Sequence, residues 1–255
     1  MGNIKRREAA LYHVKQMDQK YLDKIKNSVD FSKIYSNNSE FDQNKQKTEN
    51  TVNQIIERLD SVLAVKKYSK FGKVAVLNFA SFKHPGGGFI NGSMAQEEAL
   101  CHESTLYNVI VDDTFSRFYN YNNHHLNRGM YHNRAIYSPN IAFTGENDEI
   151  VAYADVITCA CPNYSYYIKM KVSPSENLLT LKSRIGFVKK ILVENDVQIA
   201  ILGAYGCGVF GQDPLEVAKI FKEFLSGKYK CFNKVIFAIP NKLEMNYRCF
   251  KRIFK

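Results

Sequence analysis

The feature that most constrains the fold is a series of short, almost wholly apolar runs that recurs from residue 74 onward. Such runs are typical of strands buried on both faces of a sheet. They lie at Val74–Phe79, Asp155–Ala160, Gln198–Ala204 and Lys234–Ile239. Helical patterns lie near residues 94–110, 175–194, 213–226 and 243–254. Alternating strands and helices predict a layered α/β fold with a mostly parallel sheet. The stretch Arg134–Tyr153 has a strand–turn–strand pattern, so we expect the sheet to be mixed.

The first part of the chain has a different pattern. Residues 5–27 carry apolar side chains at helical spacing. Residues 28–50 are rich in Ser, Asn, Asp and Gln, which indicates a loop or an extended crossing. Thr48 then precedes a second helical pattern, which runs from Val52 to Leu63.

Neither of these helices alone could bury its apolar stripe. We therefore expect residues 1–66 to form a helical N-terminal extension that packs on a core of residues 70–255. On this interpretation residues 1–255 are a single domain, which is a common size for one large core.

The formal net charge of the 255-residue chain is +10, which favours polyanions such as nucleic acid, nucleotide polymers or acidic membranes. No apolar run approaches the ~20 residues of a spanning helix, and the polar, basic start of the chain is unlike a secretory signal. The six cysteines form no C-x-x-C pair and no zinc-site spacing. We expect a cytoplasmic protein with reduced thiols, no metal, no cofactor and no membrane.

Two glycine-rich loops, Ser81–Gly88 and Gly203–Gly211, each follow a predicted strand. Ligands of open α/β sheets bind at the carboxyl ends of the strands. The second loop leads into Asp213-Pro214, a helix cap followed by proline at the first helical position. Free N–H groups at that helix start, together with those of the loop, predict a phosphate or diphosphate site. Glycines that merely turn the chain are the alternative, but two such loops favour a ligand. Neither a Walker nor a Rossmann pattern is present.

A pair of carboxylates, Glu97 and Glu98, lies shortly after the first glycine loop, at the start of a predicted helix. Acidic residues are common there, because the helix dipole favours them. Beside two ligand loops, however, the pair is a candidate for acid catalysis. Neighbouring like charges and partial burial raise the pKa of one carboxyl, and a protonated Glu is what glycosidic bond cleavage needs.

These motifs together resemble the signature of bacterial-type poly(ADP-ribose) glycohydrolases, in which a triple glycine is followed shortly by Gln-Glu-Glu. The segments that carry the resemblance are Asn78–Ser81, Pro85–Gly88, Ala95–Cys101, Gly203–Pro214, Asp155–Thr158, Arg134–Pro139 and Arg6–Glu8. They are long and are spread over nearly the whole chain. Tyr205 stands where the family often has Trp, and His84 where it often has Asn.

The resemblance implies a macrodomain, a three-layer α/β/α fold with a mixed central sheet and an N-terminal helical extension. It also implies hydrolysis of ribose–ribose bonds in poly(ADP-ribose), with release of ADP-ribose. Glu98 would be the acid, Glu97 would hold ribose hydroxyls, and Asn78 would help to fix the distal ribose. The other implied substrate-binding residues are Gly86, Gly87, Gly88 and Gln96 near the ribose, and Gly206, Cys207, Gly208, Val209 and Phe210 around the diphosphate.

We expect the histidines, Cys207 and the basic C-terminal residues to have structural rather than catalytic roles. His102, His124, His125 and His132 show no ligand spacing, so they are expected in the core or on the surface. Cys207 is expected to be a small packed residue rather than a nucleophile. The basic residues of the C-terminal region are Lys228, Lys230, Lys234, Arg248, Lys251, Arg252 and Lys255. We interpret them as solvated surface.

Three other functions fit parts of these observations. A macrodomain that reads ADP-ribose without cleaving it needs the diphosphate loop but not paired glutamates, and a mono-ADP-ribosyl hydrolase is a second possibility. A single-stranded nucleic-acid binder would need basic residues interleaved with exposed aromatics on strands. The strands here are apolar, so we expect no sequence-specific nucleic-acid recognition.

Overall fold

The computed structural model describes residues 3–45, 52–167, 171–226 and 233–255. Its centre is a seven-stranded sheet of order β1-β4-β5-β3-β6-β7-β2. The strands are β1 Lys33–Ser36, β2 Asn53–Glu57, β3 Val74–Phe79, β4 Arg134–Thr144, β5 Ile150–Cys159, β6 Ile199–Leu202 and β7 Lys234–Ala238. The neighbours β5, β3, β6, β7 and β2 pair in parallel, whereas β4 is antiparallel to both β1 and β5. The sheet is therefore mixed, as the sequence predicts.

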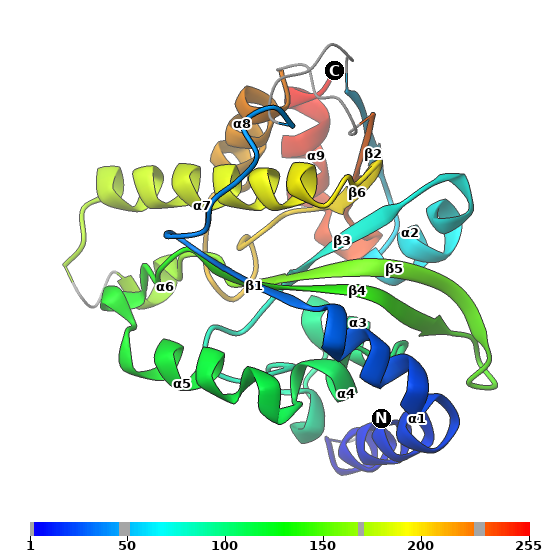
Figure 1. Cartoon of the computed structure of the whole chain (residues 1–255). Helices are drawn as coiled ribbons and strands as arrows, with labels where there is room; N and C mark the ends of the chain where they lie inside the picture. The colour runs from blue at the N-terminus through cyan, green and yellow to red at the C-terminus, as the bar shows by residue number, and fades with distance from the viewer. Residues whose placement is uncertain (1–2, 46–51, 168–170, 227–232) are drawn as a thin grey trace.

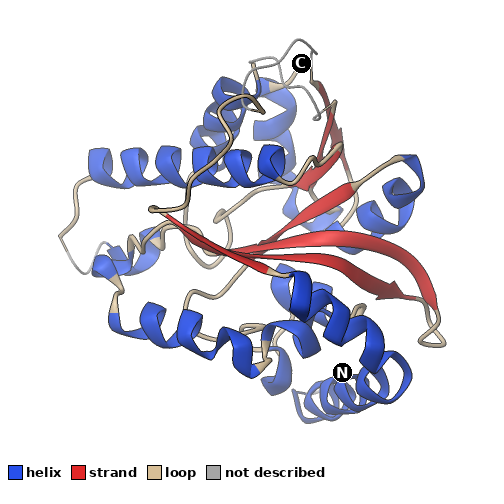
Figure 2. Cartoon of the chain, in the orientation of Figure 1, coloured by secondary structure: helices blue, strands red, loops and turns tan. Residues whose placement is uncertain are grey.

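Helices cover both faces of this sheet (Figures 1 and 2). They are α1 Asn3–Phe31, α2 Ser61–Tyr68, α3 Gln96–His102, α4 Leu106–Ile110, α5 Ser116–His124, α6 Tyr164–Tyr167, α7 Pro174–Glu194, α8 Pro214–Leu225 and α9 Glu244–Ile253. Figure 1 shows α7, α8 and α9 on one side of the sheet and α1, α3, α4 and α5 on the other. This is the expected three-layer α/β/α architecture.

The alternation of side chains along β3 builds both cores. Val74 and Val76 pack with apolar residues of α1, α2, α3 and α4. Ala75 and Leu77 pack with those of α7 and α8. The strand is buried on both faces, which is why it reads as an unbroken apolar run in the sequence.

The N-terminal extension differs from the expectation. Residues 3–31 are helical, with a kink at Tyr21, but β1 and β2 belong to the main sheet. The helix expected from Val52 to Leu63 is wrong for its first half, because Asn53–Glu57 pairs in parallel with β7. Residues 1–66 are therefore not a purely helical extension. Thr48 and Cys231 lie outside the described residues.

Local capping explains where the later helices begin. Ser173 and Asp213 are the N-caps of α7 and α8, and each is followed by proline at the first helical turn. Both helix starts lie close to those predicted. The helix expected near residues 94–110 is divided into α3 and α4.

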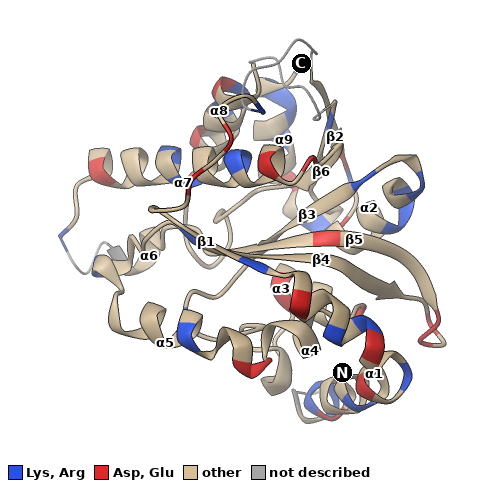
Figure 3. Ribbon diagram, in the orientation of Figure 1, with Lys and Arg blue, Asp and Glu red and all other residues tan. Residues whose placement is uncertain are grey.

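The surface charge is spread over the fold. Figure 3 shows Lys and Arg on both helical layers, with acidic residues interspersed along α1 and α7. Of the C-terminal basic residues, Arg248 pairs with Glu244, whereas Lys228 and Lys230 lie outside the described residues. Within the described part of the chain, no helix is both long enough and apolar enough to cross a membrane.

Candidate active site

A cavity of about 900 Å³ lies at the carboxyl ends of the parallel strands. Its wall includes residues that directly follow strands, namely Ser81 after β3, Cys161 after β5, Ala204 after β6 and Ile239 after β7. Ligands of open α/β sheets bind at this edge. Both glycine-rich loops and the start of α3 contribute to the wall, so the cavity unites the two motifs predicted from the sequence.

Glu98 joins the start of α3 to the triple glycine. It is the third residue of the helix, and its Oε2 accepts a hydrogen bond from the Ala95 N–H at 2.9 Å. Its Oε1 accepts from the Gly88 N–H at 2.8 Å. The carboxylate thereby satisfies one free donor at the helix start and fixes the glycine loop against the helix. Glu98 lines the cavity although the side chain is largely buried.

Glu97 is held from the other side, by the end of β3. Its Oε1 accepts from Asn78 Nδ2 at 3.1 Å, and its Oε2 accepts from the Ser81 N–H at 2.6 Å. Burial raises the pKa of Glu97 from 4.5 to about 8, and the charge of Glu98 acts in the same direction. Hydrogen bonds from the Ser81 backbone, the Asn78 side chain and the Gly86 backbone lower the pKa, and so oppose this shift only in part. At neutral pH Glu97 is therefore mostly uncharged.

Asn78 and Gln96 use their side-chain amides for hydrogen bonds within the protein. Asn78 is fully buried, does not line the cavity, and also donates to Thr158 Oγ1 at 3.3 Å. The Gln96 Oε1 accepts from the Phe79 N–H at 2.8 Å, and its Nε2 donates to the Leu77 carbonyl at 2.9 Å. Gln96 lines the cavity, but its amide is engaged with the end of β3.

The three glycines have different positions. Gly86 and Gly87 adopt positive φ of 69° and 59°, and only Gly87 lines the cavity. A Cβ at Gly87 would lie 2.7 Å from Glu98 Oε1 and 2.9 Å from Glu97 Oε2. Its backbone thus lies directly against both carboxyl groups, which only a residue without a side chain permits. Gly86 lies behind it, against the ring of Tyr107.

The second glycine loop supplies unused N–H groups. In the described structure no hydrogen bond engages the N–H of Gly206, Gly208, Val209 or Phe210, and all four residues line the cavity. A run of free N–H groups in a glycine loop is an anion site. The start of α8 does not contribute as expected. Its N–H groups at Leu215 and Glu216 are already capped by the Asp213 carboxylate.

Cys207 does not line the cavity. It packs against the core, and burial raises its pKa. Both facts agree with a packed residue rather than a nucleophile. Behind the same wall, the fully buried Arg184 donates to the carbonyl of Ala160 and, at 2.7 Å, to Asn133 Oδ1. These bonds fix the segment that follows β5.

Sequence reasoning missed several residues of the cavity wall. Phe82 and Tyr131 stack with ring centroids 4.1 Å apart, and both line the cavity beside Lys83. Tyr131 has a φ of 58°, which no sequence pattern predicts. The cavity wall also includes the segment after β7, with Lys242 and Leu243. The rule that loops after parallel strands meet at one edge would have found this segment.

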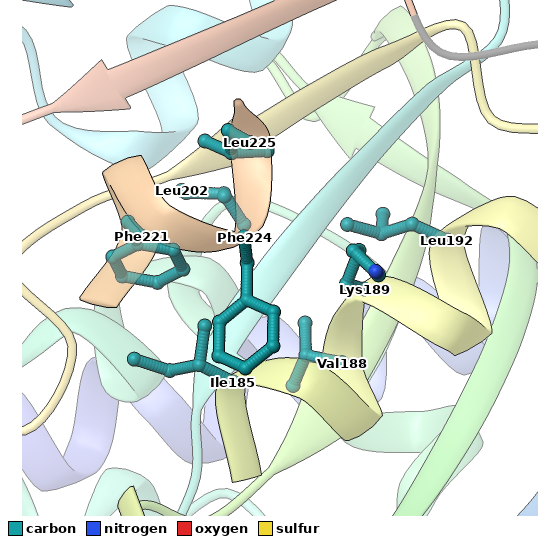
Figure 4. Close-up of a pocket in the computed structure, with 8 residues that line it drawn as sticks. All are labelled: Ile185, Val188, Lys189, Leu192, Leu202, Phe221, Phe224 and Leu225. Carbon is teal, nitrogen blue, oxygen red and sulfur yellow. The ribbon is translucent and has the colours of Figure 1, made fainter. Parts of the chain in front are cut away.

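Two further features of the described structure bear on ligand binding. In the residues that the structure describes, no three His, Cys, Asp or Glu side chains gather as metal ligands would. A hollow of about 10 Å³ lies between α7 and α8, where Figure 4 shows Ile185, Phe221 and Phe224 facing one another. It has room for about one water molecule, so it is a packing gap.

The raised pKa of Glu97 predicts a pH-dependent stability. Its folded-state pKa lies above its unfolded value, so the stability it contributes is complete below pH 4.5 and is lost as the pH rises through about 8. Each tenfold difference in proton affinity is worth about 1.4 kcal/mol. We expect urea unfolding to show a steep loss of stability between pH 5 and 9, and Glu97→Gln to flatten it. A control variant at the exposed Glu103, Glu103→Gln, should keep the wild-type slope. An unchanged slope in Glu97→Gln would contradict the shift.

Comparisons with known proteins agree with this site. A family model described as the catalytic domain of microbial-type PARG matches residues 4–145, more than half of the chain. A search of curated proteins finds no significant match.

Solved structures of bacterial enzymes are also similar. The poly(ADP-ribose) glycohydrolase of Thermomonospora curvata is 24% identical, with a TM-score of 0.84 over 98% of this chain and 99% of that one. The T267R variant of the Deinococcus radiodurans enzyme, solved with ADP-ribose, is 25% identical, with a TM-score of 0.79 over 91% and 97%. The chain therefore belongs to the microbial-type poly(ADP-ribose) glycohydrolase (PARG) family and is a glycosidase of that family.

Proposed function

We propose that this enzyme binds the terminal ADP-ribose unit of poly(ADP-ribose) in the cavity and cleaves its ribose–ribose bond with Glu98 as the general acid. One observation carries the proposal. A single cavity holds two carboxyl groups against a glycine backbone and a loop with four unused N–H groups. The first arrangement suits glycosidic cleavage, and the second suits a diphosphate.

The proposed chemistry places a proton on Glu98. As the bond from sugar C1 to the 2′ oxygen breaks, Glu98 gives its proton to that oxygen, and positive charge develops on the ribose. The ionised carboxylate then takes a proton from the water that attacks C1. This proton replaces the one given to the 2′ oxygen, so Glu98 is again protonated at the end of the cycle.

Glu97 is proposed to hold the ribose hydroxyls rather than to transfer the proton. Its carboxyl is fixed by Asn78 and by the Ser81 N–H, so it presents a rigid partner. Because its pKa is about 8, Glu97 is mostly uncharged at neutral pH, so it does not repel the carboxylate that Glu98 becomes after it has given up its proton. Asn78 acts through Glu97, without contact with the sugar.

The glycine loop Gly206–Phe210 is proposed to bind the diphosphate through its free N–H groups. Phe210, which packs edge-on to Tyr131 at 6.3 Å between ring centroids, would border the distal ribose. We further propose that residues 1–255 act as one domain, since α1 packs on the sheet and β1 and β2 belong to it.

Labelled poly(ADP-ribose) and a mono-ADP-ribosylated protein, offered separately, test the substrate. We expect ADP-ribose to be released from the polymer. Release from the mono-modified protein alone would make the chain a mono-ADP-ribosyl hydrolase, and binding without release would make it a reader.

Gly208→Val tests the diphosphate loop. A Cβ at Gly208 would meet no atom within 4 Å, so the variant should fold normally and its side chain can only obstruct a ligand. We expect ADP-ribose to bind at least ~10-fold more weakly, because approach to the neighbouring N–H groups is blocked. Calorimetry measures the affinity, with adenosine, which lacks a diphosphate, as the matched ligand. Unchanged ADP-ribose affinity in a folded variant would refute the loop assignment.

A further inference from the structure

A basic and aromatic surface lies beside the part of the cavity wall formed by Phe82 and Lys83, outside the site described above. It is formed by Tyr121 of α5, by His125 directly after this helix, by His132 just before β4 and by Arg134, the first residue of β4. We call this surface the α5–β4 patch. The rings of Tyr121 and His125 stack with centroids 3.9 Å apart and an interplanar angle of 10°. The Arg134 guanidinium lies 4.2 Å from the Tyr121 ring centroid. The Tyr121 hydroxyl and His132 Nδ1 are 3.2 Å apart and share a hydrogen bond.

No acidic side chain neutralises this patch. The sequence contains no Asp or Glu from Ser116 to Gly145. Arg134 donates through Nε to Asn122 Oδ1 at 3.0 Å, and no ion pair in the described part of the chain includes Arg134, His125 or His132. A guanidinium held by an aromatic ring and a neutral amide keeps its charge for an external anion.

The α5–β4 patch is continuous with the cavity wall. Asn122, which holds Arg134, donates through Nδ2 to the Phe82 carbonyl at 2.9 Å. Asn123 donates to the carbonyl of Lys83 at 3.3 Å. Phe82 and Lys83 both line the cavity, and so does Tyr131, the residue before His132. The loop that carries Phe82 starts at Ser81, whose N–H donates to Glu97. The patch therefore borders the end of the cavity at which the carboxylates lie.

We propose that the α5–β4 patch is a second subsite, which binds the adenosine diphosphate part of the ADP-ribose unit on the far side of the cleaved bond. This inference rests on the proposed function. When the terminal unit occupies the cavity, the leaving 2′ oxygen belongs to the next unit, whose adenosine must lie outside the cavity. The exposed ring of His125 offers adenine a stacking partner. Arg134 and Lys83 offer positive charge to the diphosphate.

The subsite makes a polymer bind better than its terminal unit alone, and this is the measurable consequence. Tyr121→Ala and His125→Ala should each raise the KM for poly(ADP-ribose) at least about fivefold, the effect expected from the loss of one stacking contact. The kcat and the affinity for free ADP-ribose should stay at wild-type values, because neither residue lines the cavity.

His124→Ala is the matched control. His124 is the neighbouring exposed histidine, and its Nδ1 bonds a backbone carbonyl four residues earlier at 2.8 Å, as that of His125 does. In the described structure His124 makes no ring contact with the patch, so the KM of His124→Ala for poly(ADP-ribose) should be unchanged. Melting temperatures of all variants establish that each is folded.

The outcomes separate this inference from the proposed function. If wild type releases no ADP-ribose from polymer, the proposed function fails. If wild type is active and both variants keep the wild-type KM, or if His124→Ala raises KM equally, only the subsite fails. A single-stranded RNA that binds wild type but not His125→Ala, with the polymer KM unchanged in that variant, would make the patch a nucleic-acid site and overturn the proposal.

Discussion

Glu98→Gln should hydrolyse poly(ADP-ribose) at least ~10²-fold more slowly than wild type, because glutamine cannot deliver a proton to the leaving oxygen. The kcat from initial rates of ADP-ribose release measures the effect. The affinity for free ADP-ribose, measured by calorimetry, should change by only a few fold. Loss of kcat with retained ligand binding identifies a group that acts mainly in the transition state.

The Glu98→Gln substitution also changes the hydrogen bonds at this position. Both oxygens of Glu98 accept hydrogen bonds from backbone N–H groups, at Gly88 and Ala95. Glutamine has one oxygen, so its amide group must face one of these donors and one bond is lost. A lost hydrogen bond typically costs about 1 kcal/mol, which is too little to account for a 10²-fold loss of kcat if it alone were responsible. A small fall in melting temperature is therefore expected and does not weaken the test.

Glu103→Gln is the control for this prediction. Glu103 lies just beyond the same short helix, and its partner is the surface residue Lys66, with the two atoms 2.6 Å apart. It should retain wild-type kcat, since surface ion pairs contribute little. Near-normal turnover by a folded Glu98→Gln protein would show that another group supplies the proton.

The strands of the core were predictable, and those of the N-terminal segment were not. β3 was predicted with its observed bounds, because a strand buried on both faces must be apolar throughout. Val52, Ile55 and Ile56 fit either a helix or a short strand, since short apolar runs do not distinguish the two. Residues 53–57 form a strand because they pair with β7, about 180 residues later in the sequence. A local sequence pattern contains no information about such a distant partner.

The chemical groups of the site were found in the sequence, whereas their surroundings were not. Glycine loops after strands and a carboxylate pair are local signals, and the fold brings them to one cavity. The pKa of Glu97 depends on its burial and on the distances to Asn78 and Ser81, which arise from packing of α3 on β3. The sequence predicts that Asp213 caps α8. It does not by itself show that this cap occupies the N–H donors at the helix start, which are then not free for a ligand.

Gly87→Ala should lower kcat by about 10²-fold while the protein stays folded. The new methyl carbon would lie 2.7 Å from Glu98 Oε1 and 2.9 Å from Glu97 Oε2, well inside ordinary contact distance. Neither carboxyl can simply rotate away, because both are fixed by backbone N–H groups at Gly88, Ala95 and Ser81. The pair must therefore shift, and a displacement near 1 Å of a catalytic group can cost about 10²-fold in rate.

The backbone adds a separate and smaller cost. Gly87 has a φ of 59°, a conformation in which alanine is strained by about 1–2 kcal/mol. Gly92→Ala is the matched control, since Gly92 has a φ of 79° and ends the short 3₁₀ helix that follows this loop. It should lose similar stability but keep its kcat. If thermal melting shows comparable losses in both variants and turnover falls only in Gly87→Ala, the contact with the carboxylates is responsible. Equal loss of turnover in both would mean that loop strain, rather than the position of Glu97 and Glu98, limits the reaction.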